Sequence, residues 1–160
     1  MTTSVLIENA RPDDLGAILA VMKPWNMHRV PSPEMEDLDL DCFFVARLEG
    51  RVIGAAGYKI LSPTRGKTTL LAVLPECNRP GIGGRLQEVR LQAMSALGVK
   101  TVITNADRPN VIDWYKKKFG YREVGTLAKL HSFGHPDIDH WTTLELDLES
   151  YTQAGAREGV

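Results

Sequence analysis

The chain has 160 residues, of which 43% are hydrophobic, and a formal net charge of −1. This length and apolar content suffice for one domain with a substantial core, and the near-neutral charge gives no general attraction to nucleic acid or to a membrane surface. No apolar stretch reaches the roughly 18 residues of a membrane span, and residues 1–7 are too short and uncharged for a secretion signal. The two cysteines, Cys42 and Cys77, are expected to stay reduced, which predicts a cytoplasmic protein.

The first half of the chain alternates strand and helix patterns. Residues 5–8 predict a strand, and Pro12-Asp13-Asp14 predicts the start of a helix whose apolar stripe stops at Pro24. Residues 25–41 are the least regular part, with a short helix expected around residues 34–38. Residues 43–48 and 51–61 are predicted strands, and the Glu49-Gly50 pair between them is a hairpin signal.

The second half contains the clearest periodicity. Residues 68–74 predict a buried strand that ends at Pro75. Apolar residues then recur every three or four positions, which predicts a helix whose buried face consists of Ile82, Leu86, Val89, Ala93 and Leu97. A strand at 99–104, a helix at about 109–119 and strands at 121–130 and 141–148 follow, and residues 151–160 are expected to form a flexible tail. This order predicts a mixed α/β fold with a parallel βαβ crossover.

A glycine-rich turn joins the strand at 68–74 to the helix that begins at Ile82. Gly81, Gly83 and Gly84 remove side chains where the backbone would curl around a ligand, and the N–H groups and dipole of a helix start favour an anion. Arg79 and Arg85 flank the turn and could donate charge-assisted hydrogen bonds to phosphate oxygens. The spacing is neither that of a P-loop nor that of a dinucleotide fingerprint. A strand-to-helix connection that binds nothing is the alternative.

Two segments resemble motifs of the GNAT superfamily of acyl-CoA-dependent N-acyltransferases. The segment LAVLPECNRPGIGG resembles its pyrophosphate motif, Gln/Arg-x-x-Gly-x-Gly/Ala after a strand ending in V-x-P, although Asn78 stands where Gln or Arg is usual. The segment NADRPNVIDWYKKKFGYREVG resembles its later motif, in which an Asn near a strand end precedes a helix with a Tyr, a basic residue and Gly-Phe. One extra residue separates Tyr115 from Gly120 in this chain.

The resemblance implies a fold, a cofactor and a reaction. It implies one mixed α/β domain over residues 1–150, with a central splayed sheet of about seven strands flanked by about four helices. It also implies an N-acetyltransferase that moves an acetyl group from acetyl-CoA, without a metal, to a primary amine of a small molecule in a ternary complex. The CoA-binding residues it implies are Leu71, Val73, Asn78, Arg79, Pro80, Gly81, Ile82, Gly83, Gly84, Arg85, Asn105, Asn110 and Tyr115.

The same resemblance assigns catalytic roles. Tyr115 is the expected general acid for the leaving thiolate, and backbone N–H groups at Val73 or Leu74 are the expected oxyanion donors. Tyr115 also shares helical spacing with apolar neighbours, so a core position is the alternative. Glu76 is a candidate general base, and the four histidines stay open as further candidates, His28, His131, His135 and His140.

The acceptor side is less defined. Acidic residues that would attract a cationic amine, or that form a solvated surface, are Glu34, Glu36, Asp37, Asp39 and Asp41. The loop at 131–140 carries histidine and aspartate side chains that could contact a substrate or, in a competing hypothesis, a metal ion. A protein or peptide acceptor and a non-catalytic acyl-CoA-binding module are further alternatives. We expect no nucleic-acid or membrane partner, and the sequence leaves a homodimer open.

Overall fold

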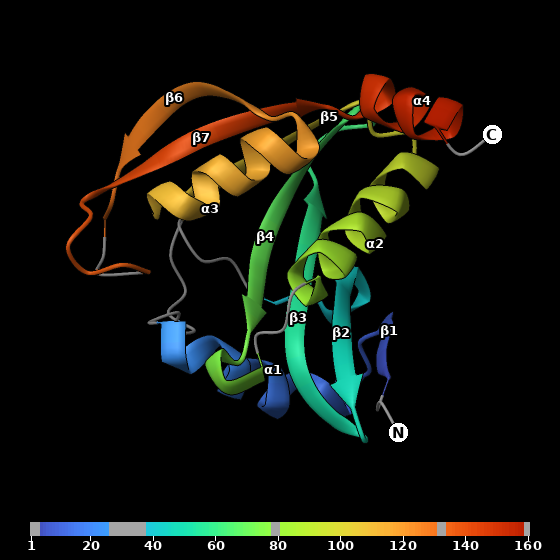
Figure 1. The fold of residues 1–160 in the computed structure, drawn as a ribbon, viewed down its shortest axis with the longest axis vertical. Helices are drawn as coiled ribbons and strands as arrows, with labels where there is room; N and C mark the ends of the chain where they lie inside the picture. Colours follow the sequence, from blue (N-terminus) through green and yellow to red (C-terminus); the bar gives the residue numbers. More distant parts are fainter. Residues whose placement is uncertain (1–3, 26–37, 78–80, 131–133, 159–160) are drawn as a thin grey trace. The chain divides into compact units, whose positions relative to one another are not determined.

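The computed structural model describes residues 4–25, 38–77, 81–130 and 134–158, with the side chains of 154–158 left aside. These residues form seven strands in one sheet with the order β1-β2-β3-β4-β5-β7-β6, together with four α-helices (Figure 1). The mixed α/β fold predicted from the sequence is therefore confirmed. The strands are β1 Val5–Asn9, β2 Phe43–Leu48, β3 Arg51–Ile60, β4 Arg65–Val73, β5 Thr101–Ala106, β6 Arg122–Ala128 and β7 His140–Asp147. The α-helices are α1 Leu15–Met22, α2 Ile82–Ala96, α3 Pro109–Trp114 and α4 Leu148–Glu158.

The chain divides into two compact units, the first made of residues 1–58 and 69–92 and the second of residues 59–68 and 93–160. In the first unit β1, β2 and β3 lie side by side as antiparallel neighbours. The turn between β2 and β3 has positive φ at both central residues, 53° at Glu49 and 81° at Gly50, as a tight hairpin requires. The predicted hairpin is thus confirmed.

Two glycines let β3 approach its neighbours in the first unit. A Cβ at Gly57 would lie 2.5 Å from the Thr69 hydroxyl and 2.6 Å from ring atoms of Phe43. A Cβ at Gly54 would lie 3.2 Å from the carbonyl oxygen of Ala72 on β4 and from a Leu86 methyl on α2. The absence of side chains at these positions therefore permits close packing of β3 against β4 and α2.

The buried face of α2 differs from the predicted one. Val89 and Ala93 are only half-buried and Leu97 is 59% exposed beyond the end of the helix. The fully buried positions of α2 include two polar residues, Gln87 and Arg90. A hydrophobic pattern cannot reveal such a face, because it assigns polar residues to the solvent side.

The second unit contains the parallel part of the sheet. The first residues of β4 pair in parallel with β5, Arg65 with Thr101 and Lys67 with Ile103, and α2 provides the crossover. β7 then pairs antiparallel with both β5 and β6. β4 begins at Arg65, three residues before the predicted start at residue 68. The strand thus includes Gly66, whose lack of a side chain permits close packing, since a Cβ there would lie 2.7 Å from the Met94 sulfur.

The end of the chain was predicted as a flexible tail from residue 151, but the structure continues as α4 to Glu158. The Asp147 carboxylate accepts hydrogen bonds from the Ser150 N–H at 3.0 Å and from its hydroxyl at 2.9 Å, so it caps the helix start. The Tyr151 ring lies 6.2 Å from that of Phe119. The short helix expected around residues 34–38 falls on residues of which only Leu38 is described, and Leu38 is not helical.

Candidate active site

The glycine turn leads into α2 in the first unit. Gly81 has a φ of 93°, a left-handed conformation that strains residues with a Cβ. Among the residues that the structure describes, none beyond the chain neighbours and the helix's own backbone places a heavy atom within 4 Å of a Cβ built at Gly81 or Gly83. The Arg85 N–H donates to the Gly81 carbonyl at 2.9 Å and begins the helical hydrogen bonds. The N–H groups before it, from Ile82 to Gly84, are those that a helix start leaves for an external acceptor.

The structure describes only some of the residues predicted to bind CoA in this turn. Ile82 is 4% exposed and belongs to the core, Gly84 is buried, and the Arg85 side chain is exposed. Asn78, Arg79 and Pro80 lie outside the described residues.

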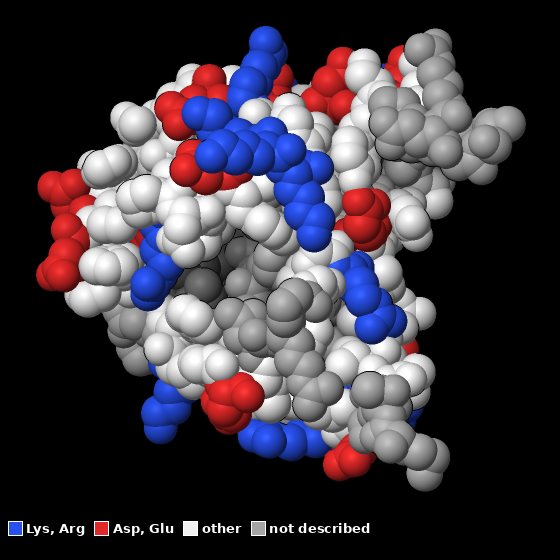
Figure 2. Space-filling model, viewed as in Figure 1, with Lys and Arg blue, Asp and Glu red and all other residues white. Residues whose placement is uncertain are grey.

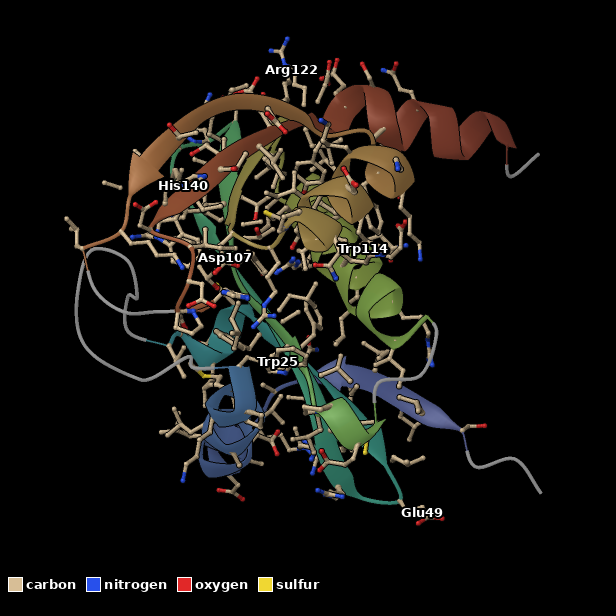
Figure 3. All side chains as sticks on the ribbon, turned by 60° about the vertical axis from the view of Figure 1, so that its left-hand side comes forward. Trp25, Glu49, Asp107, Trp114, Arg122 and His140 are labelled. Atoms are coloured by element: carbon tan, nitrogen blue, oxygen red, sulfur yellow. The ribbon has the colours of Figure 1, made fainter. Side chains whose placement is uncertain are left out.

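The end of β4 is engaged by a tryptophan that the sequence analysis did not identify. The indole N–H of Trp25, in the helical turn Lys23–Trp25, donates to the Val73 carbonyl at 2.8 Å (Figure 3). The Leu74 N–H donates to the Ile53 carbonyl at 2.8 Å. Leu74 is thus already used within the sheet, which removes it as a free oxyanion donor and leaves Val73.

A buried arginine binds the carbonyl groups of two strands. Arg90 has no exposed surface, and its Nη1 donates to the Leu70 carbonyl on β4 at 2.8 Å and to the Gly57 carbonyl on β3 at 3.1 Å. Its Nε donates to the Gln87 side chain at 2.6 Å. The guanidinium thus connects α2 to both strands. No local sequence signal predicts this arrangement, because Arg90 is 20 and 33 positions from its backbone partners.

The candidate base Glu76 lies in the helical turn Pro75–Cys77, directly after β4. Its carboxylate lies 3.5 Å from the Arg51 guanidinium, and both side chains are more than half exposed. Such an exposed pair contributes little to stability, and it leaves Glu76 open to solvent.

The acidic segment before β2 is partly described. Asp39 accepts a hydrogen bond from the Asp41 N–H at 3.1 Å, and the Cys42 thiol lies 3.7 Å from its other carboxylate oxygen. Burial and the nearby carboxylates raise the pKa of Cys42, and burial raises the pKa of Tyr58 beside it. Asp39 and Asp41 therefore shape a turn. Glu34, Glu36, Asp37, His28 and His131 lie outside the described residues.

In the second unit Asn105 occupies β5. Its side-chain oxygen accepts a hydrogen bond from the Thr143 hydroxyl on β7 at 2.7 Å. Asn105 is thus a strand residue whose side chain has a partner on the neighbouring strand. Asn110 is exposed in the first turn of α3.

Tyr115 begins a π-helical turn, Tyr115–Phe119, that continues α3. The Tyr121 N–H donates to the Tyr115 carbonyl at 3.3 Å across this widened turn, and Gly120 ends it with a φ of 84°. A π turn accommodates one residue more than an α turn, which accounts for the extra residue before Gly120. The Tyr115 side chain is 4% exposed and its ring contacts those of Trp114 and Tyr121 edge-on at 5.0 Å.

A nearly buried ion pair, also missed by the sequence analysis, anchors the late loop of the second unit. Asp107, directly after β5, accepts hydrogen bonds from the Lys129 ammonium at 3.0 Å and from the His135 N–H at 2.7 Å (Figure 3). Lys129 also donates to the His135 carbonyl at 3.0 Å and lies 4.6 Å from the centre of the Trp141 ring. Burial alone would raise the pKa of Asp107, but these hydrogen bonds and the Lys129 charge outweigh it and lower that pKa below its usual value.

The two described histidines of this loop, His135 and His140, have local partners. The His135 ring accepts a hydrogen bond from the Asp137 N–H at 3.2 Å, and the His140 ring lies 3.1 Å from the Asp139 carboxylate. Within the part of the chain that the structure describes, no three His, Cys, Asp or Glu side chains gather as metal ligands would. The described helices include none with the length and apolar character to cross a membrane. Acidic and basic side chains both occur on the face shown in Figure 2.

Comparison with known proteins gives the family. Residues 10–121 match the family model described as acetyltransferase (GNAT) family, whereas no curated protein matches the chain. Among solved structures, the chain is similar to Ard1 from Thermoplasma volcanium, with a TM-score of 0.70 and 20% identity over 88% of this chain and 95% of that one. It is similar to the ribosomal-protein-S18-alanine N-acetyltransferase from Escherichia coli, with a TM-score of 0.69 and 18% identity over 91% and 94%.

A third similar structure is N-acetylglutamate synthase from Neisseria gonorrhoeae complexed with coenzyme A and N-acetyl-glutamate, with a TM-score of 0.69 and 18% identity over 92% of this chain. The chain spans only 36% of the length of that synthase. At such identities these structures support the fold, and the family model, which covers more than half of the chain, supports membership. The chain therefore belongs to the GNAT family of acetyltransferases and is an acyltransferase.

Proposed function

We propose that this acyltransferase moves an acetyl group from acetyl-CoA directly to a primary amine of a small molecule, within a ternary complex. The start of α2 is the observation that supports this most: Gly81 has a φ of 93°, and no side chain of the described residues lies within 4 Å of a Cβ built at Gly83. Peptide N–H groups without covering side chains at a helix start suit a diphosphate, the group that coenzyme A carries.

The proposed binding residues follow the strand and the turn. Backbone groups of Leu71 and Val73 would pair with the pantetheine arm, and the turn would bind the diphosphate. The turn residues in this proposal are Asn78, Arg79, Pro80, Gly81, Ile82, Gly83, Gly84 and Arg85. Asn105, Asn110 and Tyr115 are the further residues proposed for CoA binding on the family resemblance, although Asn105 already has one bond, to Thr143 at 2.7 Å.

The reaction forms a C–N bond and breaks a C–S bond. The neutral amine attacks the thioester carbonyl, the Val73 N–H is the proposed donor to the developing oxyanion, and the thiolate of coenzyme A leaves. Tyr115 is proposed to protonate that thiolate, since its phenolic hydroxyl is a proton donor. Glu76 is the proposed acceptor of the proton that the amine gives up. Its accessibility beside Arg51, at 3.5 Å, is compatible with proton transfer through water.

A matched pair of glycine variants tests the diphosphate site. Gly83→Ala and Gly16→Ala both add a methyl group to a helix, at positions where no side chain in the described part of the chain lies within 4 Å of the new Cβ. Both are expected to fold with unchanged or slightly raised stability. Calorimetry with coenzyme A should show about ten-fold weaker binding for Gly83→Ala, and wild-type affinity for Gly16→Ala. No heat of binding with the wild type, or equal affinities of the two variants, would reject the proposal.

Catalysis is tested by the release of the CoA thiol across a panel of amines and short peptides. Turnover with small amines but not with peptide N-termini supports the proposed acceptor class. The reverse result would favour a peptide acceptor, as in the structurally similar S18-alanine acetyltransferase. Tyr115→Phe should lower kcat about a hundred-fold with little change in CoA affinity, because the lost hydroxyl acts on the leaving group. An unchanged kcat would remove the acid role.

A further inference from the structure

The buried guanidinium of Arg90 has no role in the reaction as proposed above. It donates to the carbonyl oxygens of Leu70 and Gly57 at 2.8 and 3.1 Å, and its side chain has no contact with solvent. Removing a guanidinium from water is costly, and hydrogen bonds from a charged donor are about twice as strong as neutral ones. The two backbone acceptors are thus bound by a strong, always charged donor within the first unit.

The bond to Leu70 acts on one peptide group. In a trans peptide the C=O of one residue and the N–H of the next point in opposite directions. The Leu71 N–H therefore points away from the side of β4 on which Arg90 binds the Leu70 carbonyl. A hydrogen bond accepted by a peptide carbonyl polarises the whole amide and strengthens its N–H as a donor, the more so where water is excluded.

We propose that Arg90 is a positioning residue: it orients and polarises the Leu70–Leu71 peptide, so that the Leu71 N–H binds a carbonyl oxygen of the pantetheine arm of acyl-CoA more strongly. This inference rests on the proposed function, because it takes acyl-CoA as the ligand of β4. Arg90 contacts no ligand atom in this account and acts only through the backbone.

The bond to Gly57 supports the same role. The same Nη1 atom donates to a carbonyl on β3 and to a carbonyl on β4. The guanidinium therefore fixes the positions of these two strands relative to each other and to α2. The Gln87 side chain, 2.6 Å from Nε, fixes the orientation of the planar group. A planar group bound at both ends has little freedom to turn, so the Leu70 carbonyl keeps its direction.

The test separates the two halves of coenzyme A. Affinities are measured by calorimetry for coenzyme A and for 3′-phosphoadenosine 5′-diphosphate, which has the diphosphate but lacks the pantetheine arm. Arg90→Met removes the donor with similar volume, and Arg90→Gln keeps a neutral, weaker donor. Leu91→Met, at the neighbouring buried position of α2, controls for repacking of the helix. Circular dichroism and thermal unfolding verify the fold of each variant.

The expected result is a loss confined to the pantetheine arm. Arg90→Met should bind coenzyme A about five-fold more weakly and Arg90→Gln by a smaller factor, with the affinity for the nucleotide half unchanged in both. Equal losses for both ligands, or wild-type affinity for coenzyme A, would overturn the inference. If Arg90→Met does not fold, Arg90→Gln decides by the same comparison. A wild-type protein that binds neither ligand would instead refute the proposed function.

Discussion

The Asp107–Lys129 pair offers a test of what stabilises the second unit. The Lys129 side chain is 5% exposed and that of Asp107 is 12% exposed, and the two charged groups lie 3.0 Å apart. The same carboxylate accepts the His135 N–H at 2.7 Å. Asp107→Ala therefore removes both the carboxylate that faces a buried ammonium and the acceptor of a backbone N–H.

The size of the effect follows from burial. Removing one partner of a buried ion pair costs about 3–5 kcal/mol, and an orphaned N–H adds about 1–3 kcal/mol if the loop cannot relax. Since Lys129 keeps its bond to the His135 carbonyl at 3.0 Å and its place on the Trp141 ring, we expect about 3–4 kcal/mol in total for Asp107→Ala. Asp107→Asn should cost less, because an amide oxygen can still accept one bond.

Urea unfolding at pH 7, followed by circular dichroism, measures these free energies. The double variant Asp107→Asn with Lys129→Met, which removes both charges, should be more stable than the sum of its single changes implies. Hydrogen exchange at the His135 amide should be faster in Asp107→Ala than in the wild type. A loss below about 1 kcal/mol for Asp107→Ala, with unchanged exchange at His135, would show that the pair is not essential to this loop.

Three further predictions concern the first unit. Gly57→Ala should lower the free energy of unfolding by about 1–3 kcal/mol, because its Cβ would lie 2.6 Å from the Phe43 ring; an unfolding curve equal to the wild type would contradict this close approach. Trp25→Phe should lower kcat more than CoA affinity, because the freed Val73 carbonyl would repel the developing oxyanion. Steady-state kinetics measures kcat and calorimetry measures the affinity; a larger loss of affinity than of kcat would contradict this prediction. Burial raises the pKa of Asp14, but its hydrogen bonds and the charge of Arg47 lower that pKa overall, so its stabilising contribution is present above about pH 4 and is lost as the pH falls through the lowered pKa. Acid titration of Asp14→Asn, followed by circular dichroism, should therefore show a flatter decline in stability than the wild type.

Features with a local cause could be predicted from the sequence. The alternation in β7 was predicted correctly, since Thr142, Leu144 and Leu146 are all buried. The hairpin at Glu49-Gly50 follows from Gly50, which adopts its φ of 81° without strain. The family resemblance, borne out by the match over residues 10–121, likewise rested on contiguous motifs. The roles of Tyr115 and Glu76 remain predictions.

The sequence by itself determined the chain order of the seven strands and of α1, α2 and α3, the glycine turn before α2 and the family, because each depends on neighbouring residues or on a short repeat. Only the tertiary structure decided which polar groups meet: Trp25 with Val73 across 48 positions, Lys129 with Asp107 across 22 and Arg90 with Leu70 across 20. The physical reason is that a buried polar group needs a hydrogen-bond partner, and that partner can come from any part of the chain that folding brings within about 3 Å. Periodicity contains no information about that choice.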